Sequence, residues 1–194
     1  MRLINIFTGE LKTFYSAEIP PYGILSHRWG DQEVSLKTYQ ADQQHGRQRQ
    51  SKVTDFCTHL RDVTYTQEPV EWAWVDTCFI NKESSAELTE FINSMYQWYA
   101  YATLCVVHLA DVTIVPCARK CKRRCQSCRL SNQQFADSRW FRRGWTLQEL
   151  IAPRKLKFVS ADWQDLGLKQ GPWSHRVQPF LNRITAITCI PSKF

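Results

Sequence analysis

The sequence predicts an α/β domain with a mostly parallel central sheet, helices on both faces of the sheet, and a short N-terminal hairpin. Two observations support this prediction. Short apolar runs alternate with amphipathic stretches along the chain, as strands alternate with helices around a parallel sheet. The chain has 194 residues, of which 43% are hydrophobic and 13% aromatic, enough to form the core of one domain. Residues 1–194 are therefore interpreted as a single domain.

The N-terminal third contains a predicted hairpin and one buried strand. The runs RLINIF and LKTFYS flank Thr8 and Gly9, which is typical of a short hairpin. The compact apolar run YGILS predicts a strand that ends near Ser26. The following stretch QQHGRQRQSK, at 43–52, has no apolar periodicity and is predicted to be a solvated loop.

Helices and strands alternate in the rest of the chain. A helix face is predicted from the spacing of Val53, Phe56, Cys57, Leu60 and Val63 or Thr64. The run EWAWVDT then predicts a buried strand, and residues 84–102 predict a long helix that opens with the capping-box spacing of Ser84 and Glu87. TLCVVHLADV predicts a strand, RGWTLQELIA a short helix before Pro153, and KLKFVS a further strand.

Composition restricts the compartment and the partners. No apolar run approaches the roughly 20 residues needed to cross a bilayer, and the N-terminus carries charges where a signal peptide has its apolar core. We therefore expect a cytoplasmic protein without a membrane partner. Its eight cysteines are expected to be thiols or metal ligands in a reducing compartment.

Most of the net charge of +7 lies in one segment, 116–134, which resembles an insertion. It contains four closely spaced cysteines: Cys117, Cys121, Cys125 and Cys128. These residues predict a structural zinc site only if the segment folds back on itself, because a straight helix would hold its outer cysteines about 16 Å apart. The alternative is a basic loop with incidental cysteines. Nucleic acid is not a predicted partner, since no base-reading or stacking element accompanies the basic residues.

Polar and aromatic side chains follow three predicted strands: His27, Arg28 and Trp29 follow the first, Asp76 and Thr77 the second, and Asp111 the third. In an open parallel sheet, ligands bind beyond the carboxyl ends of the strands. The convergence of unlike groups predicts a binding site at this edge. The alternative for Arg28 and Asp76 is a structural ion pair that closes the loops.

Three stretches resemble the heterokaryon-incompatibility (HET) domain of fungal proteins: YGILSHRWGDQEVSL, WAWVDTCFINKESSAELTEFINSMYQWYAYA and SRWFRRGWTLQELIAPRKLKFV. The resemblance runs in order from Tyr22 to the SADW and RITAIT segments, and segment 116–134 departs from it. It implies a cell-death effector of fungal non-self recognition, at the N-terminus of a larger receptor with C-terminal regulatory or sensor domains.

A more distant resemblance is to Toll/interleukin-receptor (TIR) domains, which implies a TIR-like, flavodoxin-like sheet. The first strand of TIR domains ends in a pattern of Ser, an aromatic residue, Arg, Gly and an acidic residue. Here this pattern is matched by Ser26, His27, Arg28 and Asp31, with a histidine in place of the aromatic residue and Trp29 inserted. Trp145 and Glu149 match the spacing of a Trp four residues before a Glu. Several TIR domains cleave nicotinamide from NAD with that Glu, so the resemblance implies that Glu149 is catalytic and that NAD is the substrate.

The chemistry is consistent with one essential carboxylate. Cleavage of the nicotinamide–ribose bond develops positive charge on the sugar, which a carboxylate stabilises. Trp145 is predicted to stack on the base or the sugar, and arginines to bind the diphosphate. The predicted substrate-binding residues are His27, Arg28, Trp29, Asp31, Asp76, Arg143 and Trp145.

Two other interpretations remain open. Glu149 is also explained by a helix-dipole contact or a pair with Arg142 or Arg143, and Trp145 with Leu147 and Leu150 by core packing. The domain would then be a non-enzymatic assembly module that recruits death machinery. Self-association is expected under either interpretation, because a death-triggering activity must be silent in the resting cell and proximity between copies is a simple trigger.

Overall fold

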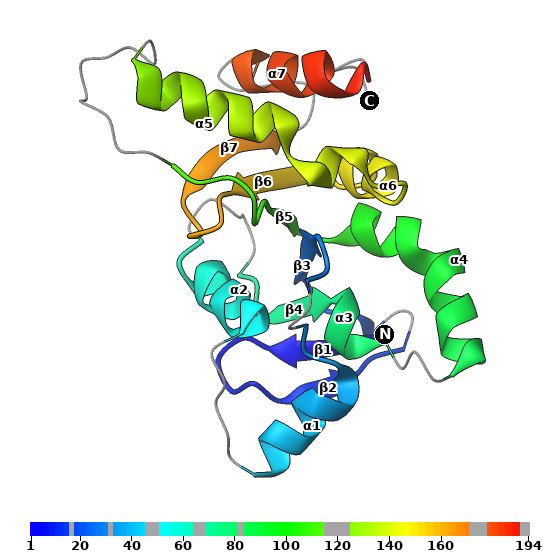
Figure 1. Ribbon diagram of the computed structural model, residues 1–194. Helices are drawn as coiled ribbons and strands as arrows, with labels where there is room; N and C mark the ends of the chain where they lie inside the picture. The colour runs from blue at the N-terminus through cyan, green and yellow to red at the C-terminus, as the bar shows by residue number, and fades with distance from the viewer. Residues whose placement is uncertain are drawn as a thin grey trace.

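The computed structural model describes residues 1–15, 18–30, 33–45, 51–63, 69–80, 84–114, 125–170 and 178–190. These residues form one seven-stranded sheet in the order β2-β1-β4-β3-β5-β6-β7, with helices on both sides (Figure 1). The predicted α/β class is confirmed. No helix in the described ranges is long and apolar enough to cross a bilayer.

The strands are β1 Arg2–Asn5, β2 Leu11–Thr13, β3 Tyr22–His27, β4 Trp72–Val75, β5 Leu104–His108, β6 Lys155–Val159 and β7 Asp165–Gln170. The helices are α1 Leu36–Gln44, α2 Lys52–Arg61, α3 Asp76–Phe79, α4 Ser85–Tyr101, α5 Gln126–Asp137, the 3₁₀ helix η2 Arg139–Arg142, α6 Thr146–Ile151 and α7 Gln178–Thr188.

Only the centre of the sheet is parallel. β4, β3, β5 and β6 run parallel, whereas β1 pairs antiparallel with β2 and β4, and β7 pairs antiparallel with β6. The predicted N-terminal hairpin is therefore confirmed, and the sheet is mixed because this hairpin and the β6–β7 hairpin form its two edges. Counted among themselves in chain order, the parallel strands have the order 2-1-3-4. A doubly wound sheet binds ligands where this order reverses, beyond β3 and β5.

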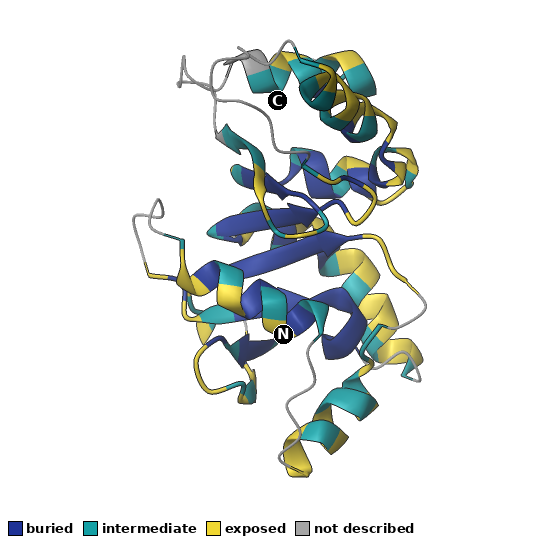
Figure 2. Cartoon of the chain, turned by 60° about the vertical axis from the view of Figure 1, so that its left-hand side comes forward, coloured by how far each residue is buried: buried dark blue, intermediate teal, exposed yellow. Residues whose placement is uncertain are grey.

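The two faces of the sheet are covered by different helices. Gly23 of β3 faces α2, because a Cβ placed there would lie 2.7 Å from a methyl group of Leu60. Trp74 of β4 faces α4, where it stacks on Phe91 with a centroid distance of 5.8 Å. The central strands are buried on both faces, as the dark blue sheet of Figure 2 shows. The side chain of Ser26 therefore faces the α4 and α6 side, and that of His27 faces the α2 side.

Several elements were absent from the sequence prediction. α1 was missed because none of its residues is buried, so it has no apolar periodicity to recognise. α5 begins in the second half of segment 116–134 and extends beyond it, and its one buried residue, Phe135, gives no apolar periodicity to recognise. α3, β7 and α7 were not predicted either.

Candidate functional site at the carboxyl ends of the parallel strands

Glu149 is a buried carboxyl group at the centre of the candidate site. It lies in the first turn of α6 and is 2% exposed. The hydroxyl of Ser26, at the end of β3, donates a hydrogen bond of 2.5 Å to Oε2 of Glu149. The indole Nε1 of Trp140 donates a hydrogen bond of 2.8 Å to Oγ of Ser26. Glu149 is thus hydrogen-bonded to β3, in the middle of the sheet.

The SRW motif holds Trp140 in place. Asp111, which follows β5, accepts hydrogen bonds from the hydroxyl of Ser138 (2.7 Å) and from the backbone N–H of Arg139 (2.9 Å). Burial raises the pKa of Asp111, but these two bonds, together with a backbone hydrogen bond and the charge of Arg139, lower the pKa overall. The hydroxyl of Thr146 donates to the carbonyl of Trp140 at 2.5 Å and joins η2 to α6. The motif therefore has a positional role at the end of β5.

Several charges act on the ionisation of Glu149. Burial raises its pKa, and Asp76 acts in the same direction. The hydrogen bond from Ser26 and the positive charge of Arg143 act in the opposite direction but do not outweigh burial. The carboxyl group is therefore a weaker acid than an exposed glutamate, which is typical of functional carboxyl groups in protein interiors.

His27 lies between two carboxylates on the other face of β3. Its Nε2 is 3.3 Å from Oε2 of Glu33 and its Nδ1 is 3.8 Å from Oδ1 of Asp76, while both ring nitrogens are buried without a hydrogen bond. Asp76 accepts a hydrogen bond of 2.7 Å from the indole of Trp29. Arg143 donates to the carbonyl of His27. Buried ring nitrogens that make no hydrogen bond favour the binding of a water or a polar ligand group here.

Glu33 anchors this part of the site. Burial raises its pKa, but the neighbouring His27 and Lys52 and the N–H of Gly30 outweigh burial and bring the pKa to about 2. Lys52, the first residue of α2, donates to Glu33 and to the carbonyl of Arg28. Glu33 is therefore an ionised group that links the end of β3 to α2.

The structure brings together five of the residues predicted from sequence: His27, Trp29, Asp76, Arg143 and Glu149. Arg28 does not pair with Asp76, so the predicted structural ion pair is not formed; its carbonyl instead accepts from Lys52. Asp31 lies outside the described residues.

Trp145 and its neighbours differ in burial. Trp145 is 42% exposed and Leu147 is 52% exposed, so the core interpretation is wrong for both, whereas Leu150 is buried at 3%. The backbone carbonyl of Trp145 accepts the N–H of Glu149 at 3.3 Å, which places the indole one turn before the buried carboxyl. An exposed tryptophan beside a buried glutamate leaves the indole available to a ligand.

The cavity beside this site is small. It measures about 70 Å³ and is lined by Arg28, His108, Leu109, Ala110, Asp111, Arg139 and Trp140. Ligand sites in proteins typically measure about 300–1,000 Å³. This cavity is therefore too small for a substrate of nucleotide size, and Glu149 itself is buried in the described structure.

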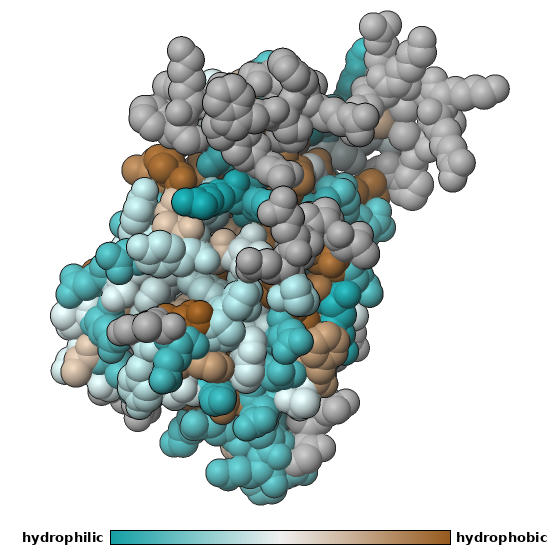
Figure 3. All heavy atoms as spheres, turned by 180° about the vertical axis from the view of Figure 1, so that it is seen from behind, coloured by the Kyte–Doolittle hydropathy of each residue, from teal (hydrophilic) through white to brown (hydrophobic). Residues whose placement is uncertain are grey.

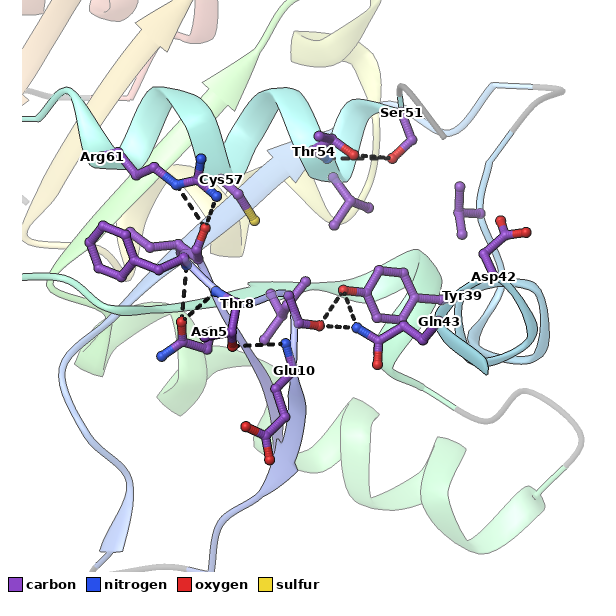
Figure 4. A pocket seen from close by; sticks show the side chains of 16 residues that line it. Asn5, Thr8, Glu10, Tyr39, Asp42, Gln43, Ser51, Thr54, Cys57 and Arg61 are labelled. Atoms are coloured by element: carbon purple, nitrogen blue, oxygen red, sulfur yellow. Dashed lines mark hydrogen bonds between the residues drawn. The ribbon is translucent and has the colours of Figure 1, made fainter. Parts of the chain in front are cut away.

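A larger cavity of about 620 Å³ lies between the β1–β2 turn, α1 and α2 (Figure 4). The hydroxyl of Tyr39 and the amide of Gln43 both donate to the carbonyl of Gly9 and join α1 to the hairpin turn. None of the residues predicted to bind substrate lines this cavity. It is therefore separate from the site around Glu149.

The predicted zinc site is only partly within the described structure. Cys117 and Cys121 lie outside the described residues, whereas Cys125 directly precedes α5 and Cys128 lies in the first turn of this helix. Among the described residues, no group of three or more His, Cys, Asp and Glu side chains is placed to hold a metal ion. Structural zinc in segment 116–134 stays a prediction.

Sequence reasoning missed three contributors to the site. Ser26 was noted only as part of the TIR pattern, and Trp140 only as part of a family motif. Glu33 carries no recognisable signal, because its role arises from the approach of α2 to the end of β3.

Comparisons with known proteins were consistent with this arrangement of motifs. The chain is 39% identical to the vegetative incompatibility protein HET-E-1 of Podospora anserina over 164 residues, which are 82% of this chain and 11% of that protein. The chain thus spans about a tenth of the length of this relative. No solved structure matches the chain, so the TIR-like fold stays a prediction. A model of the heterokaryon incompatibility protein (HET) family matches residues 22–149, and together these similarities show that the chain belongs to the HET family.

Proposed function

We propose that this chain is the death-triggering domain of a vegetative incompatibility protein, and that it hydrolyses the nicotinamide–ribose bond of NAD when assembled. One observation carries the catalytic part of the proposal. A buried carboxyl group, Glu149, is held at the carboxyl ends of the parallel strands, where Arg143, His27 and Asp76 act on it. The incompatibility role is supported by family membership and by the HET-E-1 relative.

The reaction requires one carboxylate and one water molecule. As the bond between C1′ of the ribose and the nicotinamide nitrogen breaks, its electron pair moves to the nicotinamide ring, which leaves as a neutral molecule. Glu149 stabilises the positive charge that develops on the ribose. The oxygen of water then bonds to C1′, and its proton is released, which gives ADP-ribose. Arg28 and Arg143 would bind the diphosphate, for which guanidinium groups provide paired donors.

Assembly is proposed as the trigger because the described site is closed. Glu149 is 2% exposed, and the adjoining cavity of about 70 Å³ is too small for a dinucleotide. Contacts between copies that displace η2 and α6 would open the site. This arrangement keeps the isolated domain silent, as a death-triggering activity requires.

The test is NAD consumption and nicotinamide release by the purified chain under forced clustering, with the Glu149→Gln and Glu149→Ala variants. Both variants are expected to lose about 100-fold or more in rate, because the stabilising charge is gone. Glu90→Gln, a carboxyl change on the exposed face of α4, serves as the matched control and should retain activity. A Glu149→Gln variant as active as the parent would refute the catalytic role.

The stacking role of Trp145 has its own matched pair of variants. Trp145 directly precedes α6 and Leu147 lies in its first turn, and both are exposed, so each can be truncated without opening the core. Trp145→Ala is expected to raise KM for NAD about tenfold, which corresponds to one aromatic contact. Leu147→Ala should leave KM unchanged. Equal effects of the two changes would contradict a stacking contact.

One observation favours a second candidate function, a non-enzymatic module that recruits death machinery. Glu149 is buried and accepts a hydrogen bond from Ser26, and a carboxyl group with a purely structural role would be satisfied in the same way. Under this function, clustered protein would kill cells without consuming NAD, and a folded Glu149→Gln variant would kill as well as the parent.

A further inference from the structure

We propose that Ser26 and Trp140 are positioning residues that form a one-way hydrogen-bond relay, which orients the carboxylate of Glu149 and favours its ionised form. The relay runs from the indole of Trp140 to the hydroxyl of Ser26 and from there to Oε2 of Glu149. The catalytic significance of the relay rests on the function proposed above, whereas its effect on Glu149 can be measured without any activity.

The direction of the relay follows from the chemistry of its members. An indole N–H donates but cannot accept, so the oxygen of Ser26 accepts the 2.8 Å bond from Trp140. The single hydroxyl proton of Ser26 is then directed toward Glu149, whose oxygen lies 2.5 Å away. Trp140 therefore fixes the rotation of a hydroxyl group that would otherwise have several orientations.

Burial increases the effect of the relay on Glu149. Ser26 is 0% exposed, Trp140 is 1% exposed and Glu149 is 2% exposed, so bulk water does not solvate the carboxylate. A hydrogen bond to a charged group inside a protein is stronger than one in water, because the surroundings screen it less. The hydroxyl of Ser26 thus replaces part of the hydration that Glu149 loses on folding.

The relay also joins separate parts of the fold. Ser26 belongs to β3 in the middle of the sheet, and Glu149 belongs to α6. Trp140 packs edge-on against Phe158 of β6 with a centroid distance of 5.6 Å, and its carbonyl accepts the hydroxyl of Thr146. The donor is therefore held from two sides, as a positioning group must be.

The ionisable groups around Glu149 decide the sign of the expected effect. They are Asp76, His27, Arg143, Tyr99 and Cys105. Burial raises the pKa of Glu149, whereas Ser26 and Arg143 lower it. Removal of the Ser26 hydroxyl leaves burial and Asp76 less opposed, so the pKa of Glu149 rises further. As the pH is lowered, activity that needs the carboxylate is therefore lost at a higher pH in the variant than in the parent.

The first measurement titrates Glu149 directly in the full chain by ¹³C NMR of labelled glutamate carboxyl groups, with the resonance assigned from Glu149→Gln. Ser26→Ala is expected to raise the titration midpoint, and Ser26→Thr, which keeps the hydroxyl, to restore it. Trp140→Phe keeps an aromatic ring and removes the donor together with part of the indole, and an intermediate rise is expected. Ser160→Ala is the matched control, because Ser160 is equally buried but donates to Asp162, at 2.6 Å.

The second measurement follows NAD hydrolysis by the clustered chain as a function of pH. Ser26→Ala is expected to lower kcat about 10- to 100-fold, the range expected for a hydrogen bond to a charged group, with little change in KM. The acid limb of its pH profile should move to higher pH, and Ser26→Thr should move it back.

The outcomes separate the relay from the proposed function. A Ser26→Ala protein with an unchanged Glu149 titration and an unchanged pH profile would overturn the relay, even if its stability fell. Trp140→Phe decides the same question if Ser26→Ala does not fold. A shifted titration in a chain that never hydrolyses NAD would support the relay and overturn the proposed function instead.

Discussion

At the scale of single residues, Glu33 shows how neighbours determine the behaviour of a half-buried group. Its carboxylate contacts Lys52 and lies 3.3 Å from Nε2 of His27. Burial alone would raise the pKa of Glu33, yet these neighbours and the N–H of Gly30 bring it to about 2. A pKa below the unfolded value means that Glu33 stabilises the fold in its ionised form.

We predict that Glu33→Gln lowers the free energy of unfolding at pH 7 by about 2 kcal/mol. The stabilisation from Glu33 is present above the unfolded pKa of about 4.5 and is lost as the pH falls through about 2. The difference between variant and parent should therefore shrink between pH 5 and pH 2, as urea unfolding at several pH values would measure. Glu10→Gln, at an exposed turn, is the control. A difference that stays constant over this range would contradict the prediction.

Residue identities in the site were predictable to different degrees. His27, Asp76 and Glu149 were identified because each follows a strand or matches a spacing in the sequence. The partners of these residues were not identifiable, since Ser26 and Glu149 are 123 positions apart and Trp140 lies 114 positions from Ser26. A hydrogen bond over such a separation exists only after the sheet and α6 have packed.

At the scale of elements, the approach of α2 to β3 depends on one glycine. A Cβ at Gly23 would lie 2.7 and 2.8 Å from the two methyl groups of Leu60, which is 3% exposed. The buried leucine has little room to move, because the sheet lies beneath it. Gly23 therefore sets the distance between the first parallel strand and its covering helix.

We predict that Gly23→Ala destabilises the protein by about 1–3 kcal/mol through overpacking. Leu60→Ala alone should destabilise by about 2–5 kcal/mol, because it leaves a cavity. In the double variant the new methyl group fills part of that cavity. The double variant should therefore lose less unfolding free energy than the two single variants lose in sum. Denaturant unfolding of all four proteins measures this coupling. Simple additivity would show that Gly23 and Leu60 are not in contact.

Elements differed in how far the sequence predicted them. Strands β3 and β5 were predicted from short apolar runs, and helices α2 and α4 from apolar residues that repeat at helical spacing. The side chain of Ser84 caps α4 as predicted, accepting the N–H of Glu87 at 3.3 Å. The carboxylate of Glu87 also pairs with Arg2 of β1, a contact between distant segments that no local pattern indicates.

At the scale of the whole molecule, the exposed surface bears on the proposed assembly. Seen from behind, the described surface is mostly hydrophilic, with hydrophobic atoms in small separate groups (Figure 3). On α4, Leu88, Ile92 and Tyr96 are exposed at intervals of four residues, so they share one face of the helix. Self-association of the chain stays a proposal, which activity under controlled assembly can test.

We predict that NAD turnover per molecule rises at least tenfold when chains are brought together by an inducible dimerisation tag. The physical reason is that the site is closed in the isolated domain, and contacts between copies that favour an open form would shift the population toward it. Turnover should be compared at equal total protein with and without the inducer, and Glu149→Gln should remain inactive in both. A dilute monomer as active as the clustered protein would refute assembly as the trigger.

The sequence by itself determined the α/β class, the N-terminal hairpin, the family and the prediction of Glu149 as the central residue. These depend on local periodicity and on motifs of adjacent residues, which a linear chain displays directly. Tertiary structure alone decided the antiparallel edges of the sheet, the hydrogen bonds that lead from Trp140 through Ser26 to Glu149, and the burial of Glu149. Each of these depends on contacts between segments far apart in the chain, and such contacts are set by packing rather than by local pattern.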